Sequence, residues 1–198
     1  MTKTKNQSAR KVAVTAVLAA MSSALMFLDF SIPIMPSFIK LDFSELPALI
    51  ASYALGPWYG VCVCLVKNLV NLLSTTTAGV GELSNFILGS VFVLFAGYIY
   101  KFKKNRTGAL IGALAGAACM ALISLFSNYY IVYPIYENFL PLEAILGMYR
   151  AIYPGVKNLW HALIVFNVPF TFVKGMLNTA IAFIVYKKIS TIIKGNRD

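Results

Sequence analysis

Charged residues are scarce in this sequence: they make up 12% of its 198 residues, and only seven of them are acidic. A soluble domain of this length needs a much larger charged surface. This scarcity, together with 59% hydrophobic residues and a mean hydropathy of +0.75, excludes an ordinary soluble protein and indicates an integral membrane protein.

The residues that enzymes and metal sites use are also missing. No Gly-Lys pair occurs, which excludes a P-loop, and neither an HExxH motif nor a Ser/His/Asp grouping is present. The single histidine, His161, stands alone, and Cys62 and Cys64 are two residues apart, so on a helix they point to different faces. We therefore expect no enzyme, metal or cofactor, and any ATP must be hydrolysed by a partner. A membrane-embedded enzyme and a scaffold protein are the alternatives from other classes.

The formal charge of +10 is unevenly distributed along the chain. Basic residues precede the first apolar run, follow the last one, and cluster at 101–106, whereas nearly all acids fall in or beside the connections on the opposite side. Such segregation follows the positive-inside rule and places both termini in the cytoplasm. The excess of basic residues therefore indicates membrane topology rather than nucleic-acid binding.

The apolar runs predict the fold class, an all-α integral membrane protein with six transmembrane helices and cytoplasmic N- and C-termini. A bilayer-spanning helix needs about 20 apolar residues, so the whole chain 1–198 forms a single multi-pass domain of the cell membrane. The predicted helices are about 9–28, 44–55, 58–75, 82–100, 107–133 and 159–186. External loops are predicted at about 29–43 and 134–158. The first loop is too apolar to be freely solvated, which predicts a lid over the mouth of the bundle.

Polar residues follow one face of the last predicted helix. Asn167, Thr171, Lys174 and Asn178 are spaced by four, three and four residues. A buried ammonium costs roughly 3 kcal/mol in a bilayer, so Lys174 is expected to line a polar, ligand-binding cavity. The competing interpretation is that Asn and Thr hydrogen-bond neighbouring helices. Asn178 lies deeper and is interpreted as structural.

Two other helices carry polar residues at helical spacing. Asn85 and Gly89 are candidates for the cavity wall, and Asn128 lies below a tyrosine-rich stretch at the predicted outer surface. Lys67 is also mid-helix, and we expect it to be neutralised by Glu82 or Glu45.

The first helix repeats alanine at Ala16, Ala20 and Ala24. Small residues at this spacing allow close helix approach. The stripe suits either packing within the bundle or docking of a separate membrane protein, and sequence spacing leaves both open.

Four stretches in this order resemble the substrate-binding S components of energy-coupling-factor (ECF) vitamin transporters, in particular the riboflavin-specific type. They are Leu41-Asp42-Phe43-Ser44-Glu45-Leu46-Pro47-Ala48-Leu49, Ala54-Leu55-Gly56-Pro57 with Val66-Lys67-Asn68-Leu69, Gly81-Glu82-Leu83-Ser84-Asn85-Phe86, and Val168-Pro169-Phe170-Thr171-Phe172-Val173-Lys174-Gly175. The resemblance covers nearly the whole chain.

The resemblance implies a vitamin pocket near the outer surface, under the first external loop, which brings in Leu41 and Phe43 from that loop. It implies that Asn128 and Lys174 hydrogen-bond riboflavin, the transported ligand. The family's asparagine three residues before the lysine is replaced here by Thr171, whose contact could be lost, bridged by water or taken over by Asn167. Another vitamin or a flavin analogue is the alternative ligand. The resemblance further implies docking through Ala16 and Ala20 onto a transmembrane coupling subunit that is joined to two ATPases.

Overall fold

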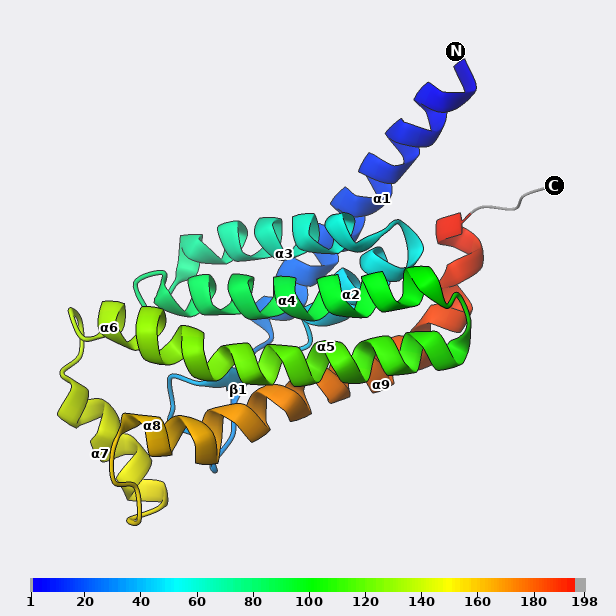
Figure 1. The fold of residues 1–198 in the computed structure, drawn as a ribbon. Helices are drawn as coiled ribbons and strands as arrows, with labels where there is room; N and C mark the ends of the chain where they lie inside the picture. The colour runs from blue at the N-terminus through cyan, green and yellow to red at the C-terminus, as the bar shows by residue number, and fades with distance from the viewer. Residues whose placement is uncertain (1, 195–198) are drawn as a thin grey trace.

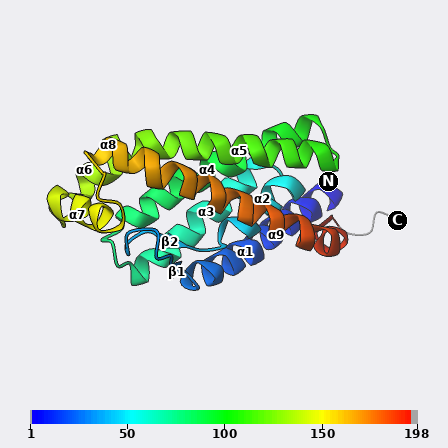
Figure 2. The same cartoon turned by 90° about the horizontal axis from the view of Figure 1, so that it is seen from below.

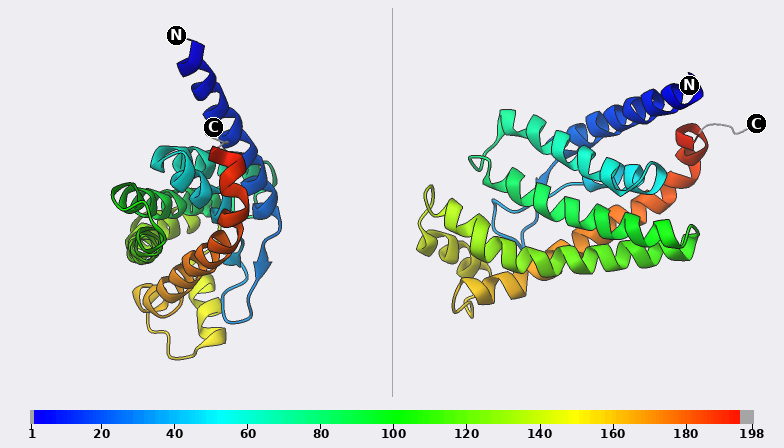
Figure 3. Two further views of the ribbon diagram at one scale, coloured as in Figure 1. Left: turned by 90° about the vertical axis from the view of Figure 1, so that its right-hand side faces the viewer. Right: turned by 45° about the horizontal axis from the view of Figure 1, so that its top comes forward.

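The protein is a bundle of long helices, seen in a computed structural model that describes residues 2–194, and the side chains of residues 7–185 (Figure 1). The start of α1, the end of α9 and the turn between α4 and α5 lie at one end of the bundle (Figure 3). The basic cluster Lys101, Lys103, Lys104 and Arg106 is at this end. The side chains of Lys3, Lys5, Lys187, Lys188 and Lys194, and the whole of Arg197, lie outside the described residues.

The helices and strands occur in the following order. The first half contains α1 (Thr2–Phe27), β1 (Phe30–Ser31), β2 (Lys40–Leu41), α2 (Glu45–Ala54), α3 (Pro57–Asn71), the short 3-10 turn η1 (Leu72–Ser74) and α4 (Val80–Phe102). The second half contains α5 (Arg106–Ser127), η2 (Asn128–Val132), α6 (Tyr133–Tyr136), α7 (Leu142–Ile152), α8 (Leu159–Ala162), η3 (Leu163–Asn167) and α9 (Val168–Lys194).

In the part of the chain that the structure describes, four helical stretches are long and apolar enough to cross a membrane: Gln7–Phe27, Val80–Phe102, Arg106–Tyr136 and Leu159–Val185. The helical fold and these stretches agree with the predicted helical membrane protein. Two further predicted helices correspond to α2 and α3, which have 10 and 15 residues. At a rise of about 1.5 Å per residue, each is shorter than a hydrocarbon core of roughly 30 Å.

Helix α2 lies at the centre of the bundle, where it packs against α1, α3, α4 and α9. Its residues 48–51 are almost completely buried and belong to the main apolar cluster. The helix begins after Ser44, and Gly56 with a φ of 125° turns the chain into α3, whose first residue is Pro57. Proline suits the first turn of a helix because the amide it lacks would have no partner there. A short helix can occupy this position because protein, rather than lipid, surrounds it.

Helices α4 and α5 pack closely along their length. Gly112 and Gly116 make this possible: a Cβ atom would lie 2.6 Å from the carbonyl oxygen of Ala96 at the first position and 2.7 Å from that of Phe92 at the second. Both distances are too short for a real contact. Any larger residue at either glycine would therefore force the two helices apart.

Two predicted long helices contain a wider π-helical turn near the α7 end of the bundle. These turns, η2 and η3, end two residues before Pro134 and Pro169 respectively. Proline has no amide hydrogen to donate to the carbonyl group four residues earlier, which disturbs regular α-helical bonding. The stretch predicted as one helix over 107–133 therefore consists of α5, η2 and the start of α6.

The predicted external loops are partly ordered. The loop at 29–43 contains the antiparallel pair β1–β2, in which Phe30 faces Leu41 and Ser31 faces Lys40. The connection at 134–158 contains α7, whose Ile145, Leu146 and Tyr149 are buried. Figure 2 shows α9 crossing one face of the bundle, with the β1–β2 segment beside it and α7 at the far end.

Candidate functional site

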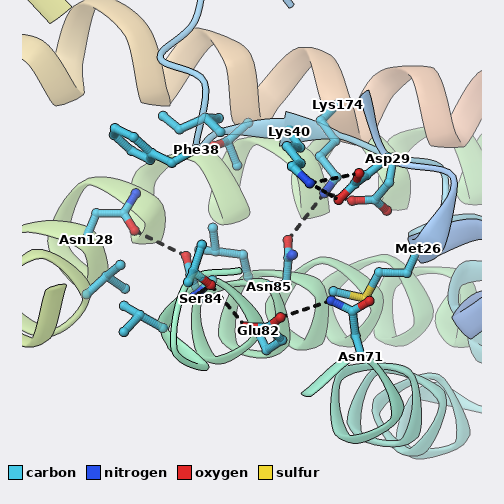
Figure 4. A pocket seen from close by; sticks show the side chains of 18 of the residues that line it. Met26, Asp29, Phe38, Lys40, Asn71, Glu82, Ser84, Asn85, Asn128 and Lys174 are labelled. Atoms are coloured by element: carbon cyan, nitrogen blue, oxygen red, sulfur yellow. Dashed lines mark hydrogen bonds and ion pairs between the residues drawn. The ribbon is translucent and has the colours of Figure 1, made fainter. Parts of the chain in front are cut away.

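A cavity of about 390 Å³ lies where the loop between α1 and α2 meets α4, η2 and α9. Asn85 comes from α4, Asn128 from η2 and Lys174 from α9, while Phe38 comes from the loop. Figure 4 shows these side chains around the same space. A cavity of this size falls within the roughly 300–1,000 Å³ typical of pockets for small organic ligands.

Most of the predicted site residues line this cavity, namely Asn85, Asn128, Asn167, Thr171 and Lys174. Three others do not line it. Leu41 is buried in the β1–β2 pair, Phe43 has its ring centroid 6.3 Å from that of Phe30, and Gly89 faces Cys64 and Glu45. These three residues therefore lie outside the surface of the cavity.

Lys174 is paired with carboxylates at the base of the cavity. Its Nζ lies 2.8 Å from Oδ2 of Asp42 and 3.5 Å from Oε1 of Glu45, and it donates to Oδ1 of Asn85 over 3.3 Å. The sequence pattern identified Lys174 as a cavity residue but gave no sign that Asp42, 132 positions away, is its partner. This ion pair ties the external loop to α9.

A second buried lysine completes a network of four charges. Lys67 Nζ lies 3.0 Å from Oε1 of Glu45, and both side chains are at least 98% buried. Of the two predicted partners, Glu45 is therefore the one that pairs with Lys67. The two lysines and the two carboxylates balance each other, which offsets the desolvation cost of burying each charge. One oxygen, Oε2 of Glu45, is buried without a hydrogen-bond partner in the described structure.

Asp42 is held in its charged form by these neighbours. Burial alone would raise the pKa of Asp42, but the nearby Lys174 and Lys67 outweigh it and lower the pKa to about 2. The backbone amide of Ser44 also donates to Oδ1 of Asp42 over 2.8 Å, which fixes the carboxylate at the start of α2. The loop is thus attached to the bundle at neutral pH by a fully ionised pair.

Asn128 occupies the first position of η2 and is almost completely buried. Its Oδ1 accepts a hydrogen bond of 3.2 Å from the hydroxyl of Ser84 on α4. This bond orients the amide group, so that its nitrogen is the group left to interact with a ligand (Figure 4).

Asn167 is oriented by a tyrosine that the sequence pattern did not identify. The hydroxyl of Tyr149 on α7 donates to Oδ1 of Asn167 over 2.6 Å and lies 2.5 Å from the hydroxyl of Tyr133. Burial, together with Tyr133, raises the pKa of Tyr149 well above its ordinary value, so its hydroxyl stays protonated and able to donate. The available sequence signal was the amphipathic character of the connection that contains α7.

Phe38 packs the loop against three tyrosine rings, two of which belong to the hydrogen-bonded pair Tyr133 and Tyr149. Its ring centroid lies 5.7 to 6.4 Å from those of Tyr133, Tyr136 and Tyr149. Aromatic pairs at such distances and tilted angles are favourable. The loop is therefore fastened at two points, by an aromatic contact near η2 and by the ion pair of Asp42 with Lys174.

Glu82 lies on the cavity wall at the start of α4, beside the turn from η1. Its Oε1 accepts from Nδ2 of Asn71 over 3.0 Å. Its Oε2 accepts from the hydroxyls of Thr75 and Thr77 over 2.9 and 3.2 Å. A carboxylate held by three donors fixes this turn and keeps its charge at the cavity surface.

A separate apolar groove runs between α1 and α3, and it contains the predicted docking residues. Ala16, Ala20 and Ala24 line it from α1, and Tyr59 and Cys62 line it from α3. Ala16 and Ala20 are exposed, whereas Ala19 is 2% exposed and packs into the bundle. The alanine stripe therefore faces outward along its length.

Comparison with known proteins identifies one family. The family model described as "ECF transporter, substrate-specific component" matches residues 10–186.

Among the part of the chain that the structure describes, no group of three or more His, Cys, Asp or Glu side chains could hold a metal ion.

Individual relatives cover almost the whole chain. The riboflavin transporter RibU of Staphylococcus aureus is 29% identical over 95% of this chain and 94% of its own length. The riboflavin transporter FmnP of Bacillus subtilis is 29% identical over 95% and 96%. A solved S component of a bacterial ECF transporter superposes with a TM-score of 0.75, at 29% identity, over 95% of this chain and 99% of that chain.

Proposed function

The chain belongs to the family of substrate-specific components of ECF transporters, and from that premise we propose that it is the riboflavin-binding subunit of such a transporter. Relatives named as riboflavin transporters match it over nearly its full length, and the solved S component shares its fold. The observation that carries the proposal is the convergence of Asn85, Asn128, Asn167, Thr171 and Lys174 on one cavity.

Riboflavin suits the chemistry of this cavity. The molecule is uncharged at neutral pH and joins a flat ring system, with carbonyl oxygens and ring nitrogens, to a chain of hydroxyl groups. The amide nitrogens of Asn128 and Asn167 and the ammonium of Lys174 are donors to such oxygens, and the hydroxyl of Thr171 both donates and accepts. The rings of Phe38 and Tyr136 supply apolar surface for the flat ring system.

Leu41, Phe43 and Gly89 have an indirect role in this proposal. Leu41 and Phe43 shape the loop that covers the cavity, and Gly89 leaves room for Glu45 behind its base. Because Glu45 contacts both Lys67 and Lys174, its position affects the ammonium that we assign to the ligand.

We place six segments in the cell membrane, with both termini in the cytoplasm. The basic turn between α4 and α5 lies at the same end as the start of α1, which fits cytoplasmic positive charge. The cavity then opens toward the outside, and α2 and α3 are the two short segments. We assign a transmembrane coupling subunit and two ATPase subunits as partners, docked on the exposed alanines of α1.

The proposed function predicts that the protein purified in detergent or nanodiscs binds riboflavin tightly and retains it. The bound flavin should give a yellow preparation with flavin absorbance, and titration of flavin-free protein should quench flavin fluorescence to saturation at one site per chain. Unrelated water-soluble vitamins serve as competitors. Failure of riboflavin to bind folded protein, or equal displacement by an unrelated vitamin, would contradict the proposal.

We also propose that the loop at 29–43 is a lid whose closure responds to the ligand. Phe38 and Asp42 attach it at two points, and Ile39 and Lys40 line the cavity between them. Exclusion of water by a closed lid strengthens the polar contacts beneath it, because these gain strength as the local dielectric constant falls.

The lid proposal predicts slower amide hydrogen exchange in residues 29–43 when riboflavin is added. The turn between α4 and α5 is the internal control, since it lies at the opposite end of the bundle. Equal exchange in the loop with and without riboflavin, while segments around Asn128 and Lys174 become protected, would show that the loop is not a lid.

A further inference from the structure

Glu82 contributes a negative charge to the cavity that no cation among the described side chains balances. Resting on the riboflavin function proposed above, we infer that this charge makes Glu82 a specificity-determining residue: it favours an uncharged flavin and disfavours a flavin that carries a phosphate group. The effect is on the ligand's charge, and does not require contact between Glu82 and the ligand.

The hydrogen-bond partners of Glu82 are all neutral. Asn71, Thr75 and Thr77 donate to its two oxygens over 2.9 to 3.2 Å. No ion pair found among the described side chains includes Glu82 (Figure 4). Glu82 is only 5% exposed, and donors on both oxygens are what a buried carboxylate needs in its charged form.

The lysines around the cavity are already occupied by other carboxylates. Lys40 pairs with Asp29 at the rim, at 3.1 Å. Lys67 and Lys174 pair with Glu45 and Asp42 in the buried network. Each of these three pairs is neutral as a whole, so the negative charge of Glu82 is left over. No arginine is among the residues that line the cavity.

A phosphate group would carry about −1.5 to −2 charges at neutral pH into this space. At an effective dielectric constant of about 20, two like unit charges roughly 10 Å apart weaken binding about tenfold or more. The uncharged vitamin has no net charge to be repelled. The cavity therefore separates the two ligands by electrostatics, even where both fit sterically.

Glu82→Gln separates the charge of this residue from its structural role. Glutamine keeps an acceptor for Nδ2 of Asn71, and its amide nitrogen can donate to the hydroxyl of Thr77, which accepts from the amide of Gly81 and has a second lone pair. The hydroxyl of Thr75 already accepts from the amides of Thr77 and Gly79, so it keeps those two bonds and loses only its carboxylate acceptor. The turn between η1 and α4 can thus keep most of its hydrogen bonds while the negative charge is lost. Glu143→Gln is the matched control, because Glu143 lies on α7 with its side chain 80% exposed and is absent from the cavity wall.

The experiment measures the dissociation constants of riboflavin and riboflavin 5′-phosphate for the wild type and both variants, at about pH 5 and about pH 7.5. We expect Glu82→Gln to lower the ratio of the phosphate's dissociation constant to that of riboflavin by about fivefold or more. Glu143→Gln should leave the ratio unchanged. In the wild type, the lower pH should narrow the gap between the two dissociation constants, because a phosphate with a second pKa of about 6 then loses most of its second negative charge.

The outcomes distinguish this inference from the proposed function. If the wild type binds riboflavin but the ratio is the same in Glu82→Gln, the assignment of Glu82 is wrong and the function stands. If Glu82→Gln does not fold, a wild-type ratio that is the same at both pH values still overturns the inference, because the charge of the phosphate then has no effect. If the wild type binds neither flavin, the proposed function and this inference fall together.

Discussion

Lys174→Ala is expected to weaken riboflavin binding by roughly 1–3 kcal/mol, or about 5- to 150-fold, as fits a charge-assisted hydrogen bond to the ligand. The same change leaves Asp42 buried without its closest cation. Removal of one partner of a buried ion pair typically costs about 3–5 kcal/mol of stability. The single variant is therefore expected to lose both affinity and thermal stability, and its affinity alone does not identify the cause.

A compensated variant separates the two effects. In the double variant Asp42→Asn with Lys174→Met, no charge is left unpaired between the loop and α9, and the introduced asparagine can still accept from the amide of Ser44. We expect its melting temperature to recover most of the loss seen in Lys174→Ala, while riboflavin affinity stays low. Riboflavin titration and melting temperatures of Lys174→Ala, the double variant and Asp42→Asn check this expectation. A stable double variant with wild-type affinity would show that Lys174 does not bind the ligand.

Ala16→Trp and Ala20→Trp are expected to abolish assembly with the coupling subunit while riboflavin affinity remains unchanged. Both alanines are exposed in the groove between α1 and α3, and neither is among the residues that line the vitamin cavity. A tryptophan there would fill the groove and prevent close helix approach. Co-purification with the coupling and ATPase subunits, together with riboflavin titration of the isolated chain, measures both properties.

Val17→Trp is the control for these variants, because Val17 is 60% exposed on the same helix but is not among the residues that line the groove. It should assemble as the wild type does. Normal assembly of Ala16→Trp and Ala20→Trp would exclude this groove as the docking surface. Loss of assembly in all three variants would mean that α1 tolerates no bulky residue, rather than that the alanine stripe is specific.

Helical spacing and the cost of buried polar groups were sufficient to predict much of the cavity. Asn167, Thr171 and Lys174 share one face of a helix, and a bilayer allows such a face only against protein or a cavity. The same rule predicted that Lys67 needs a carboxylate, and Glu45 is the partner observed. Both statements concern position and depend on one helix and on burial alone, while ligand binding by Asn167, Thr171 and Lys174 stays a prediction.

The parts that escaped prediction depend on contacts between distant segments. Asp42 in the loop pairs with Lys174 on α9, 132 positions further along the chain. The sequence pattern did not identify Tyr149, because its role depends on α7 folding back onto η3. Periodicity reports which face of a helix is polar, but it does not report which two faces meet.

The π-helical turns η2 and η3 set the rotational phase of the helix ends beyond them. Asn128 begins one turn and Asn167 ends the other, so each asparagine lies where the helix changes phase. With roughly 3.6 residues per α-helical turn, deletion of one residue from a π turn would restore regular bonding but rotate everything beyond it by about 100°. Tyr133, the residue directly after η2, would then turn away from Tyr149. The extra residue in each turn thus sets the direction in which the side chains of the helix end beyond that turn face.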